Sequence, residues 1–205
     1  MSHPLSLQEQ FGSIDIYLFD QLLKGRLTKE MGVLDAGRGG GRNLVYFMRN
    51  GFSVFGVDRS VESINQIRAL ATSVSDISRK NFRVESVERM SFADGSFDVV
   101  LSSAVLHFAE HEDHRMAMVK EMWRVLKPGG MFFARLASTV GQDQLKHIEG
   151  RRYQLPDGPD WLLVDFEMLN KTTTLLNGEW LEPFKTVVVH NKRSMSNWIL
   201  RKQPL

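Results

Sequence analysis

A glycine-rich stretch directly after a short apolar run is the first place where this sequence could do chemistry. From Val33 to Asn43 it reads VLDAGRGGGRN, with Asp35 two residues before the first glycine and glycine at four of the five positions 37–41. A bend without side chains at the carboxyl end of a strand lets backbone N–H groups approach a ligand, and open α/β sheets bind ligands at that edge. The stretch therefore predicts a binding loop.

A second carboxylate, Asp58, ends the next apolar run, SVFGVD, about 20 residues beyond the loop. A carboxylate at that spacing can accept hydrogen bonds from both hydroxyls of a ribose. The glycines fit the pattern G-x-G-x-G, whereas a dinucleotide-binding fingerprint needs a glycine at the position of Arg42. The two signals together predict a nucleoside ligand.

Strands and helices in alternation must hold these residues in place. The apolar runs GVLDAG, SVFGVD, FRVE, SFDVVLSS and MFFARLA predict five strands. One helix is expected from about Gly41, and the next is opened by Ser60 as N-cap with Glu62 in its first turn. A further helix, in HEDHRMAMVKEMWRVLKPGG, has acids at its start and Lys127 at its end, before a Pro-Gly-Gly stop.

The two ends of the sequence add a helix and a hairpin. IDIYLFDQLLKGRL places Ile14, Leu18 and Leu22 at helical spacing and is ended by Gly25, which predicts an amphipathic helix that serves as a flap or cover. KTVVVH and SNWILR are two strands joined by the turn NKRS. The expected fold class is α/β, with a doubly wound, mainly parallel seven-stranded sheet and an antiparallel edge strand from the C-terminal hairpin.

Composition describes an ordinary globular protein of 205 residues, 42% hydrophobic and 24% charged, with a formal net charge of +2 and no long single-sign block. No cysteine is present, which excludes disulfides, thiolate metal sites and cysteine nucleophiles. The N-terminus has no signal-peptide pattern, and no apolar run approaches the length of a membrane helix. We expect a soluble, cytoplasmic protein of one domain, 1–205, with a helical cover (1–30), a core (31–137) and a substrate-facing segment with the hairpin (138–205).

Four segments together resemble a known family: VLDAGRGGGRN, GVDRS, MSFADGSFDVVLSSAVLHF and EMWRVLKPGG. In this order and at this spacing the sequence is similar to the class I S-adenosylmethionine-dependent methyltransferases, in particular the small-molecule branch related to ubiquinone and menaquinone biosynthesis. The likeness runs from about Met31 to Ala137. It implies a Rossmann-like fold and transfer of a methyl group from S-adenosylmethionine to a small-molecule acceptor, with S-adenosylhomocysteine as product.

The resemblance also implies which residues hold the cofactor. Asp35 and the glycine backbone would take its methionine part, and Asp58 its ribose. Ser86 stands where the family often has an aspartate that meets the adenine amino group, so Ser86 and the backbone of Val87 are expected to hydrogen-bond adenine. Arg38 stands where the family usually has a small residue, and it either clashes with the cofactor or swings out to solvent. The full expected set is Asp35, Gly37, Arg38, Gly39, Gly41, Asp58, Arg59, Ser86, Val87 and Ser102.

A methyl group on a sulfonium sulfur is already activated, so transfer needs in-line placement and exclusion of water more than a base. His107, at the end of SSAVLHF, is the first candidate for a base, with local packing as its alternative, and Ser103 is a weaker candidate. His107, His111 and His114 would share one face of a continuous helix, but AEHEDH favours a loop and a helix start, so no metal site is predicted. Tyr17 and Trp161 are expected to shape an acceptor pocket or to pack in the core.

The acceptor is narrowed by what the sequence lacks. Pyrimidine C5 methylation uses a cysteine, and SSAV stands where amino-methylating nucleic-acid enzymes carry an Asn- or Asp-Pro-Pro-aromatic motif. A small-molecule acceptor is expected, with no nucleic acid or membrane partner. GRNLVYFMRNGFSVFGVD also resembles tellurite-resistance and thiopurine-type methyltransferases, so the acceptor atom stays open. Two alternatives also stay open: a degenerate methyltransferase-like binding or scaffold protein, motivated by Arg38 and Ser86, and a nicotinamide-dependent oxidoreductase.

Overall fold

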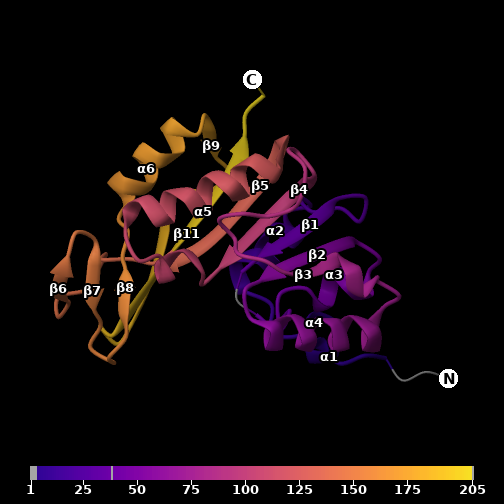
Figure 1. Ribbon diagram of the computed structural model, residues 1–205. Coiled ribbons are helices and arrows are strands. Elements are labelled where there is room, and N and C mark those ends of the chain that lie inside the picture. Colours follow the sequence, from indigo (N-terminus) through magenta and orange to yellow (C-terminus); the bar gives the residue numbers. More distant parts are fainter. Residues whose placement is uncertain (1–3, 38, 205) are drawn as a thin grey trace.

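An eight-stranded sheet forms the middle layer of the structure, a computed structural model that describes residues 4–37 and 39–204 (Figure 1). The strand order is β10-β11-β5-β4-β1-β2-β3, with β9 paired to β11. The first five strands run parallel to one another, and β1 lies between β2 and β4. The chain therefore changes direction across the sheet at β1, where β1 and β4 open a crevice at their carboxyl ends. These strands are β1 (Gly32–Ala36), β2 (Ser53–Asp58), β3 (Phe82–Val84), β4 (Phe97–Ser103) and β5 (Leu126–Ala137).

The predicted C-terminal hairpin is present as β10 (Lys185–Val189) and β11 (Arg193–Lys202). β11 lies inside the sheet, antiparallel to β5 on one side, and β10 forms the edge. β10 pairs with the first part of β11, and β9 (Gly178–Trp180) pairs with its last part. The sequence analysis did not predict β9. The α/β fold class is confirmed, and the sheet has one strand more than the seven predicted.

Helices cover both faces of the sheet (Figure 1). Side chains alternate along the strands, so that Val99 and Leu101 of β4 join one buried cluster while Val100 joins the other. The first cluster includes the apolar sides of α2 (Ile16–Leu23), α3 (Val45–Arg49) and α4 (Val61–Val74). The second includes those of α5 (Glu112–Val125) and α6 (Phe166–Leu175). Burial on both faces explains why the strands read as nearly continuous apolar runs.

Two helix boundaries differ from the predictions. The helix expected from about Gly41 begins at Val45, because Gly41 has a φ of +79°, outside the right-handed helical region. The helix α5 ends at Val125 and the chain turns extended at Leu126, so Lys127 and the Pro-Gly-Gly stop belong to β5. The predicted N-cap of α4 is confirmed, since Ser60 Oγ accepts a hydrogen bond from the Ser63 N–H at 3.2 Å.

The segment after β5 forms a second, three-stranded antiparallel sheet at the far end of the molecule from α3 and α4 (Figure 1). Its strands are β6 (Lys146–Glu149), β7 (Arg152–Gln154) and β8 (Asp160–Leu162). The polar stretch with Pro156, Gly158 and Pro159 is the turn between β7 and β8. The remaining short elements are α1 (Leu7–Phe11), η1 (Arg79–Asn81) and η2 (Leu106–Phe108). In the described part of the chain, no helix has the length and apolarity to cross a membrane.

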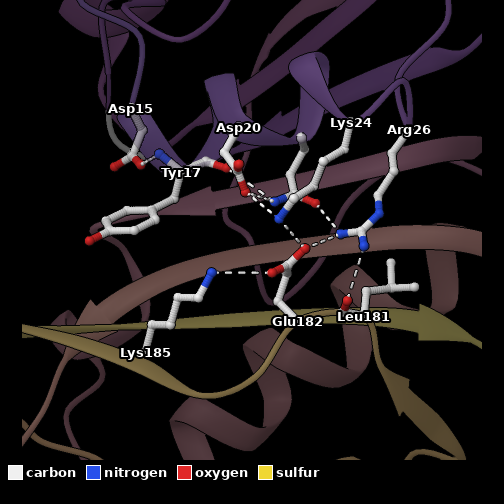
Figure 2. A network of polar contacts seen from close by, with 9 residues as sticks. Asp15, Tyr17, Asp20, Lys24, Arg26, Leu181, Glu182 and Lys185 are labelled. Atoms are coloured by element: carbon white, nitrogen blue, oxygen red, sulfur yellow. Dashed lines mark hydrogen bonds and ion pairs between the residues drawn. The ribbon is translucent and has the colours of Figure 1, made fainter.

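The N-terminal helix α2 is fastened to the rest of the molecule at both ends (Figure 2). At its start, Asp15 caps the helix by accepting from the Tyr17 N–H at 3.0 Å, and its other carboxylate oxygen accepts from Arg135 Nη1 at 2.7 Å. At its end, Lys24 and Arg26 bind Glu182, which precedes β10, at 2.6 and 2.5 Å. The helix is thus held against β5 and against the segment before the C-terminal hairpin.

Candidate cofactor site

A cavity of about 380 Å³ opens at the carboxyl ends of the parallel strands. Gly37 directly follows β1, Asp58 ends β2, and Val105 lies two residues beyond β4, and all three line the cavity. Its volume is in the range of small-molecule sites, and it lies at the crevice where the strand order reverses. The fold therefore places the predicted loop and carboxylate around one hollow.

Five of the ten residues predicted to hold the cofactor line this cavity: Gly37, Asp58, Arg59, Ser86 and Val87. Asp35, Gly39, Gly41 and Ser102 are near it in sequence but do not form its wall. Arg38 lies outside the described residues. The cavity thus gathers residues from the ends of three strands, as the spacing of the motifs predicts.

The absence of a side chain has a different reason at each glycine of the loop. Gly37 has a φ of +102°, and a Cβ there would lie 2.5 Å from Val105 Cγ1. Gly41 also has a positive φ, and a Cβ there would lie 2.8 Å from Ile67 of α4. At Gly39 a Cβ would meet only the Gly41 nitrogen, at 3.7 Å. Two glycines therefore allow close packing and a left-handed backbone, and Gly39 leaves open space beside the loop.

Asp58 presents a buried carboxylate to the cavity, with 7% of the residue exposed. Its Oδ1 accepts a hydrogen bond from the Ser60 N–H at 2.7 Å, in the turn that starts α4. An ionised carboxylate has about four acceptor positions, so one bond leaves capacity for the two hydroxyls of a ribose. The strand end and the N-cap turn together orient this side chain.

Asp35, two residues before Gly37, is not part of the cavity wall and is 8% exposed. Burial raises the pKa of Asp35 to about 7, the nearby Arg42 opposes this, and the Asp58 charge adds to it. Arg42 Nη2 also donates to Ser103 Oγ at 3.0 Å, which joins the end of the loop to the end of β4. A positive group bound near Asp35 would favour its ionised form.

The two candidate catalytic residues do not line the cavity. His107 is 2% exposed, its Nδ1 accepts from the Ala137 N–H at 3.3 Å, and its ring lies 4.2 Å from that of Trp161. Its neighbour Phe108 lines the cavity instead. Ser103 is 5% exposed and bonded to Arg42, and Ser102 Oγ, fully buried, has no hydrogen-bond partner among the described residues.

The other histidines have separate tasks in the structure. His111 is the N-cap of α5, and its Nδ1 accepts from the His114 N–H at 3.1 Å. His114 lines the cavity and pairs with Glu88. Residues 4–37 and 39–204 contain no group of three or more His, Cys, Asp or Glu side chains arranged to hold a metal ion.

Sequence reasoning missed several residues of the cavity wall. The polar ones are Ser60, Ser63, Glu88 and His114, and the apolar ones are Val105, Phe108 and Met118. Val105 and Phe108 flank His107 in the motif SSAVLHF, and Glu88 follows Ser86 by two residues, so their neighbourhood was visible. Met118 carries no such signal, since only the packing of α5 turns it to the cavity. The aromatic residues Tyr17 and Trp161 do not form the wall.

Comparison with known proteins agrees with this geometry. Residues 34–134 match the family described as a methyltransferase domain. The chain carries a methyltransferase domain. This match agrees with the methyltransferase expected from the sequence. The match runs from β1 to within β5 and covers the loop, Asp58 and the motif SSAVLHF.

Two curated relatives illustrate the methyltransferase family. An arsenite methyltransferase of Aquipseudomonas alcaligenes is 31% identical over 133 residues, covering 57% of this chain and 38% of the relative. A ubiquinone biosynthesis O-methyltransferase of Paracidovorax citrulli is 33% identical over 125 residues, covering 60% of this chain and 50% of the relative. The chain thus spans half or less of the length of these relatives.

Solved methyltransferase structures share the fold over nearly the whole chain. A 1,6-didemethyltoxoflavin-N1-methyltransferase of Burkholderia thailandensis, solved with bound 1,6-didemethyltoxoflavin and S-adenosylhomocysteine, has a TM-score of 0.67. Its sequence identity is 18%, and the alignment covers 100% of this chain and 94% of that one. This likeness extends the fold to the β6–β8 sheet and the C-terminal hairpin, which lie outside the matched family segment.

Proposed function

We propose that this methyltransferase transfers a methyl group from S-adenosylmethionine to a small-molecule acceptor by in-line displacement. The observation that carries the proposal is the cavity in which the backbone at Gly37 and the buried carboxylate of Asp58 face the same hollow. The names of the two curated relatives, for arsenite and for ubiquinone biosynthesis, support a small-molecule acceptor. A cytoplasmic location and the absence of a nucleic-acid partner remain predictions from the sequence.

The residues of the cavity fit the chemistry of a charged sulfur nucleoside. Asp58 accepts the ribose hydroxyls, and Val87, Val105 and Met118 supply apolar walls for a base. Asp35, whose pKa is raised to about 7 by burial, gains a favourable partner when an ammonium group binds beside the loop. S-adenosylmethionine supplies a methyl group that needs no further activation, so the chain contributes mainly placement and exclusion of water.

Phe108 directly follows His107 in the chain, lines the cavity and is 37% exposed. Its ring contacts that of the buried His107, with a centroid distance of 4.5 Å. We propose that Phe108 shields the methyl-transfer position from water, and that His107 supports it from behind. His107 and Ser103 stay candidate catalytic residues from the sequence. Either side chain must turn toward the cavity before it can touch an acceptor.

Calorimetry with S-adenosylhomocysteine tests the cofactor assignment. Asp58→Asn keeps the shape of the side chain and removes its charge, so we expect the affinity to fall by at least about tenfold through loss of charge-assisted hydrogen bonds. Asp160→Asn, at the exposed first position of β8, is the matched control and should bind as the wild type does. No detectable heat with the wild type at millimolar ligand would end the proposal, as would equal binding by Asp58→Asn.

Transfer of a radiolabelled methyl group tests the reaction itself. Arsenite and quinol-type phenols are the first acceptors to try, because the names of the relatives point to these two chemistries. Labelled product formed from either acceptor by the wild type, and lost in Asp58→Asn, is the expected result. Binding of S-adenosylhomocysteine without turnover on any acceptor would instead favour the alternative of a degenerate binding protein.

A further inference from the structure

A row of polar side chains crosses the central sheet next to the cofactor cavity, and the proposed function has not used it. Ser103 ends β4, Arg135 lies opposite it on β5, and Asn197 lies opposite Arg135 on β11. Three residues of the apolar cluster that contains α2 lie two positions away on the same strands: Leu101, Phe133 and Ile199. Side chains two apart on a strand point to the same face, so the polar row of Ser103, Arg135 and Asn197 faces α2.

The polar row has hydrogen-bonding capacity that the chain does not use. Arg135 Nη1 donates to Asp15 Oδ2 at 2.7 Å, but Arg135 Nε is buried and has no hydrogen-bond partner among the described residues. Asn197 is 3% exposed, and its Oδ1 also lacks a partner in the part of the chain that the structure describes. Buried polar atoms are nearly always hydrogen-bonded in proteins, so two unpaired ones on neighbouring strands indicate a place for a bound polar group.

The start of α2 holds the Arg135 guanidinium in a fixed place. One carboxylate oxygen of Asp15 caps α2 through the Tyr17 N–H, as Figure 2 shows, and the other binds Arg135. The backbone N–H of Asp15 donates in turn to Asn43 Oδ1 at 2.9 Å, and the Tyr17 ring lies 5.5 Å from Arg135 Cζ. The side chain of Arg135 keeps 23% of its surface exposed, so a ligand can reach it from solvent.

A strained turn joins the polar row to the wall of the cofactor cavity. Ala104 follows Ser103 and precedes Val105, which lines the cavity. Its φ of +62° lies in the left-handed region, which is unfavourable for alanine, and its N–H donates to the Arg135 carbonyl at 2.8 Å. Strained backbone of this kind persists where the surrounding structure fixes it, and it gathers at ligand sites. The turn at Ala104 therefore links Arg135 to the cavity.

The position of Arg135 suits one end of a methyl acceptor. β5 lies two strands from β1, and neighbouring strands are about 4.8 Å apart, so about 10 Å separate Arg135 from the glycine loop along the sheet. A small molecule held by Arg135 has room to place a nucleophilic atom at the cavity. Arginine binds carboxylates through two parallel N–H···O bonds, and its Nε with the adjacent Nη2 forms such a pair of donors.

We infer that Arg135 is a specificity-determining residue that binds a carboxylate of the methyl acceptor. The inference rests on the proposed function and adds to it the class of acceptor, a small molecule with a carboxylate at one end and the nucleophilic atom at the other. The carboxylate takes no part in the bonds that form and break. It fixes the acceptor in place, which is the main contribution that methyl transfer needs from the chain.

A ratio of two affinities tests this inference. Calorimetry on the full chain saturated with S-adenosylhomocysteine compares 4-hydroxybenzoate with 4-hydroxybenzamide, which has nearly the same shape and no charge. We expect the wild type to bind the acid about 10- to 100-fold more tightly, the range of charge-assisted hydrogen bonds. Arg135→Gln should lower the ratio to within about threefold. Arg135→Lys keeps the charge without the paired donors, so its ratio should be intermediate.

Arg201→Gln is the matched control, because Arg201 lies on β11 opposite Met131, at the other end of β5, and pairs with Glu179. It should keep the wild-type ratio. Thermal melting checks that each variant is folded, and its affinity for S-adenosylhomocysteine checks the cofactor cavity. If Arg135 serves only to fasten α2, Arg135→Gln changes the affinity for the acid and the amide equally and the ratio stays as in the wild type.

That unchanged ratio overturns the inference and leaves the proposed function standing. Equal binding of the acid and the amide by the wild type does the same, as does binding of neither compound. Failure of the wild type to bind S-adenosylhomocysteine overturns both the inference and the proposed function.

Discussion

At the scale of single residues, the missing side chains of the loop glycines have different structural roles, although the glycines form one run in the sequence. The missing side chain of Gly37 makes room for Val105, which itself lines the cavity, while that of Gly39 leaves open space. A residue that shapes the cavity through its neighbour should affect folding and binding together. A residue that only borders open space should affect folding little.

Gly37→Ala should therefore destabilise the fold by roughly 2 to 5 kcal/mol, because it adds both a strained φ and a collision with Val105. Gly39→Ala should change the free energy of unfolding by less than about 1 kcal/mol, since its Cβ meets no atom closer than 3.7 Å. Urea unfolding of both variants measures the difference. Equal changes in the free energy of unfolding would mean that both glycines serve only the approach of a ligand to the backbone.

Asp35 makes folding depend on pH. Its pKa of about 7 in the folded chain exceeds the ordinary 3.8, so the folded state keeps a proton that the unfolded state releases between these values. Stability from this group is full below about pH 4, falls as the pH rises, and is lower by up to about 4 kcal/mol above pH 7.

Asp35→Asn has no proton to lose, so its advantage in unfolding free energy over the wild type should grow from pH 4 and level off above about pH 7. Chemical denaturation at several pH values measures the free energy of unfolding of the two proteins. If the free energies of unfolding of the two proteins changed in parallel with pH, Asp35 would be solvated in the folded chain. Addition of S-adenosylhomocysteine at pH 8 should narrow the gap, because a bound ammonium group stabilises the ionised form.

At the scale of elements, α2 is held by contacts that span most of the sequence. Figure 2 shows Glu182 surrounded by Lys24, Arg26 and Lys185. Burial raises the pKa of Glu182, but hydrogen bonds from these three cations outweigh burial and lower the pKa to about 2. Because the folded pKa lies below the ordinary 4.5, the contribution to stability is present above about pH 4.5 and is lost as the pH falls through 2.

Glu182→Gln should lower the free energy of unfolding by about 1 to 3 kcal/mol at pH 7 and by little at pH 2. The range begins at about 1 kcal/mol because Lys24 and Lys185 are partly exposed, which weakens their attraction to Glu182. Glu179→Gln is the control, because its carboxylate is 48% exposed and its ion pair with Arg201 is 3.7 Å long. It should change stability by less than about 0.5 kcal/mol. Equal losses in both variants would show that α2 does not depend on Glu182.

At the scale of the whole molecule, the C-terminal hairpin belongs to the core even though it lies outside the matched segment 34–134. Trp198 of β11 is fully buried, stacks edge-on against Phe132 of β5 at 5.3 Å, and donates to Thr173 of α6 at 2.9 Å. β11 also covers the outer side of β5 along seven paired positions, from Met131 to Ala137. The matched segment alone would therefore leave the side of β5 that faces β11 unpaired.

Trp198→Ala should cost about 3 to 5 kcal/mol, the range for removing a large buried aromatic side chain. Trp180→Ala, in the partly buried edge strand β9, should cost under about 2 kcal/mol. Thermal and urea unfolding compare the two. A small loss in Trp198→Ala would mean that the hairpin is an independent appendage of the sheet.

Local patterns in the sequence were sufficient for the central sheet and its ligand loop. Apolar runs, an N-cap at Ser60 and the spacing from the glycines to Asp58 are read within short windows, and each was found where predicted. The β6–β8 sheet was missed, because strands of three or four residues give too few positions to show a period. The ten-residue helix α6 was also missed. The late start of α3 was missed because a glycine in the sequence does not show which backbone conformation it adopts, and Gly41 has a positive φ.

The sequence by itself determined the five parallel strands with the helices between them, the glycine loop, the C-terminal hairpin and the carboxylate at the end of β2. Only the tertiary structure decided which side chains face the cavity: Phe108 in place of His107, and Glu88 held by His114 beside Ser86. It also decided that Asp35 is buried. The physical reason is that periodicity and spacing describe a chain one element at a time, whereas burial and pairing arise from packing between distant segments.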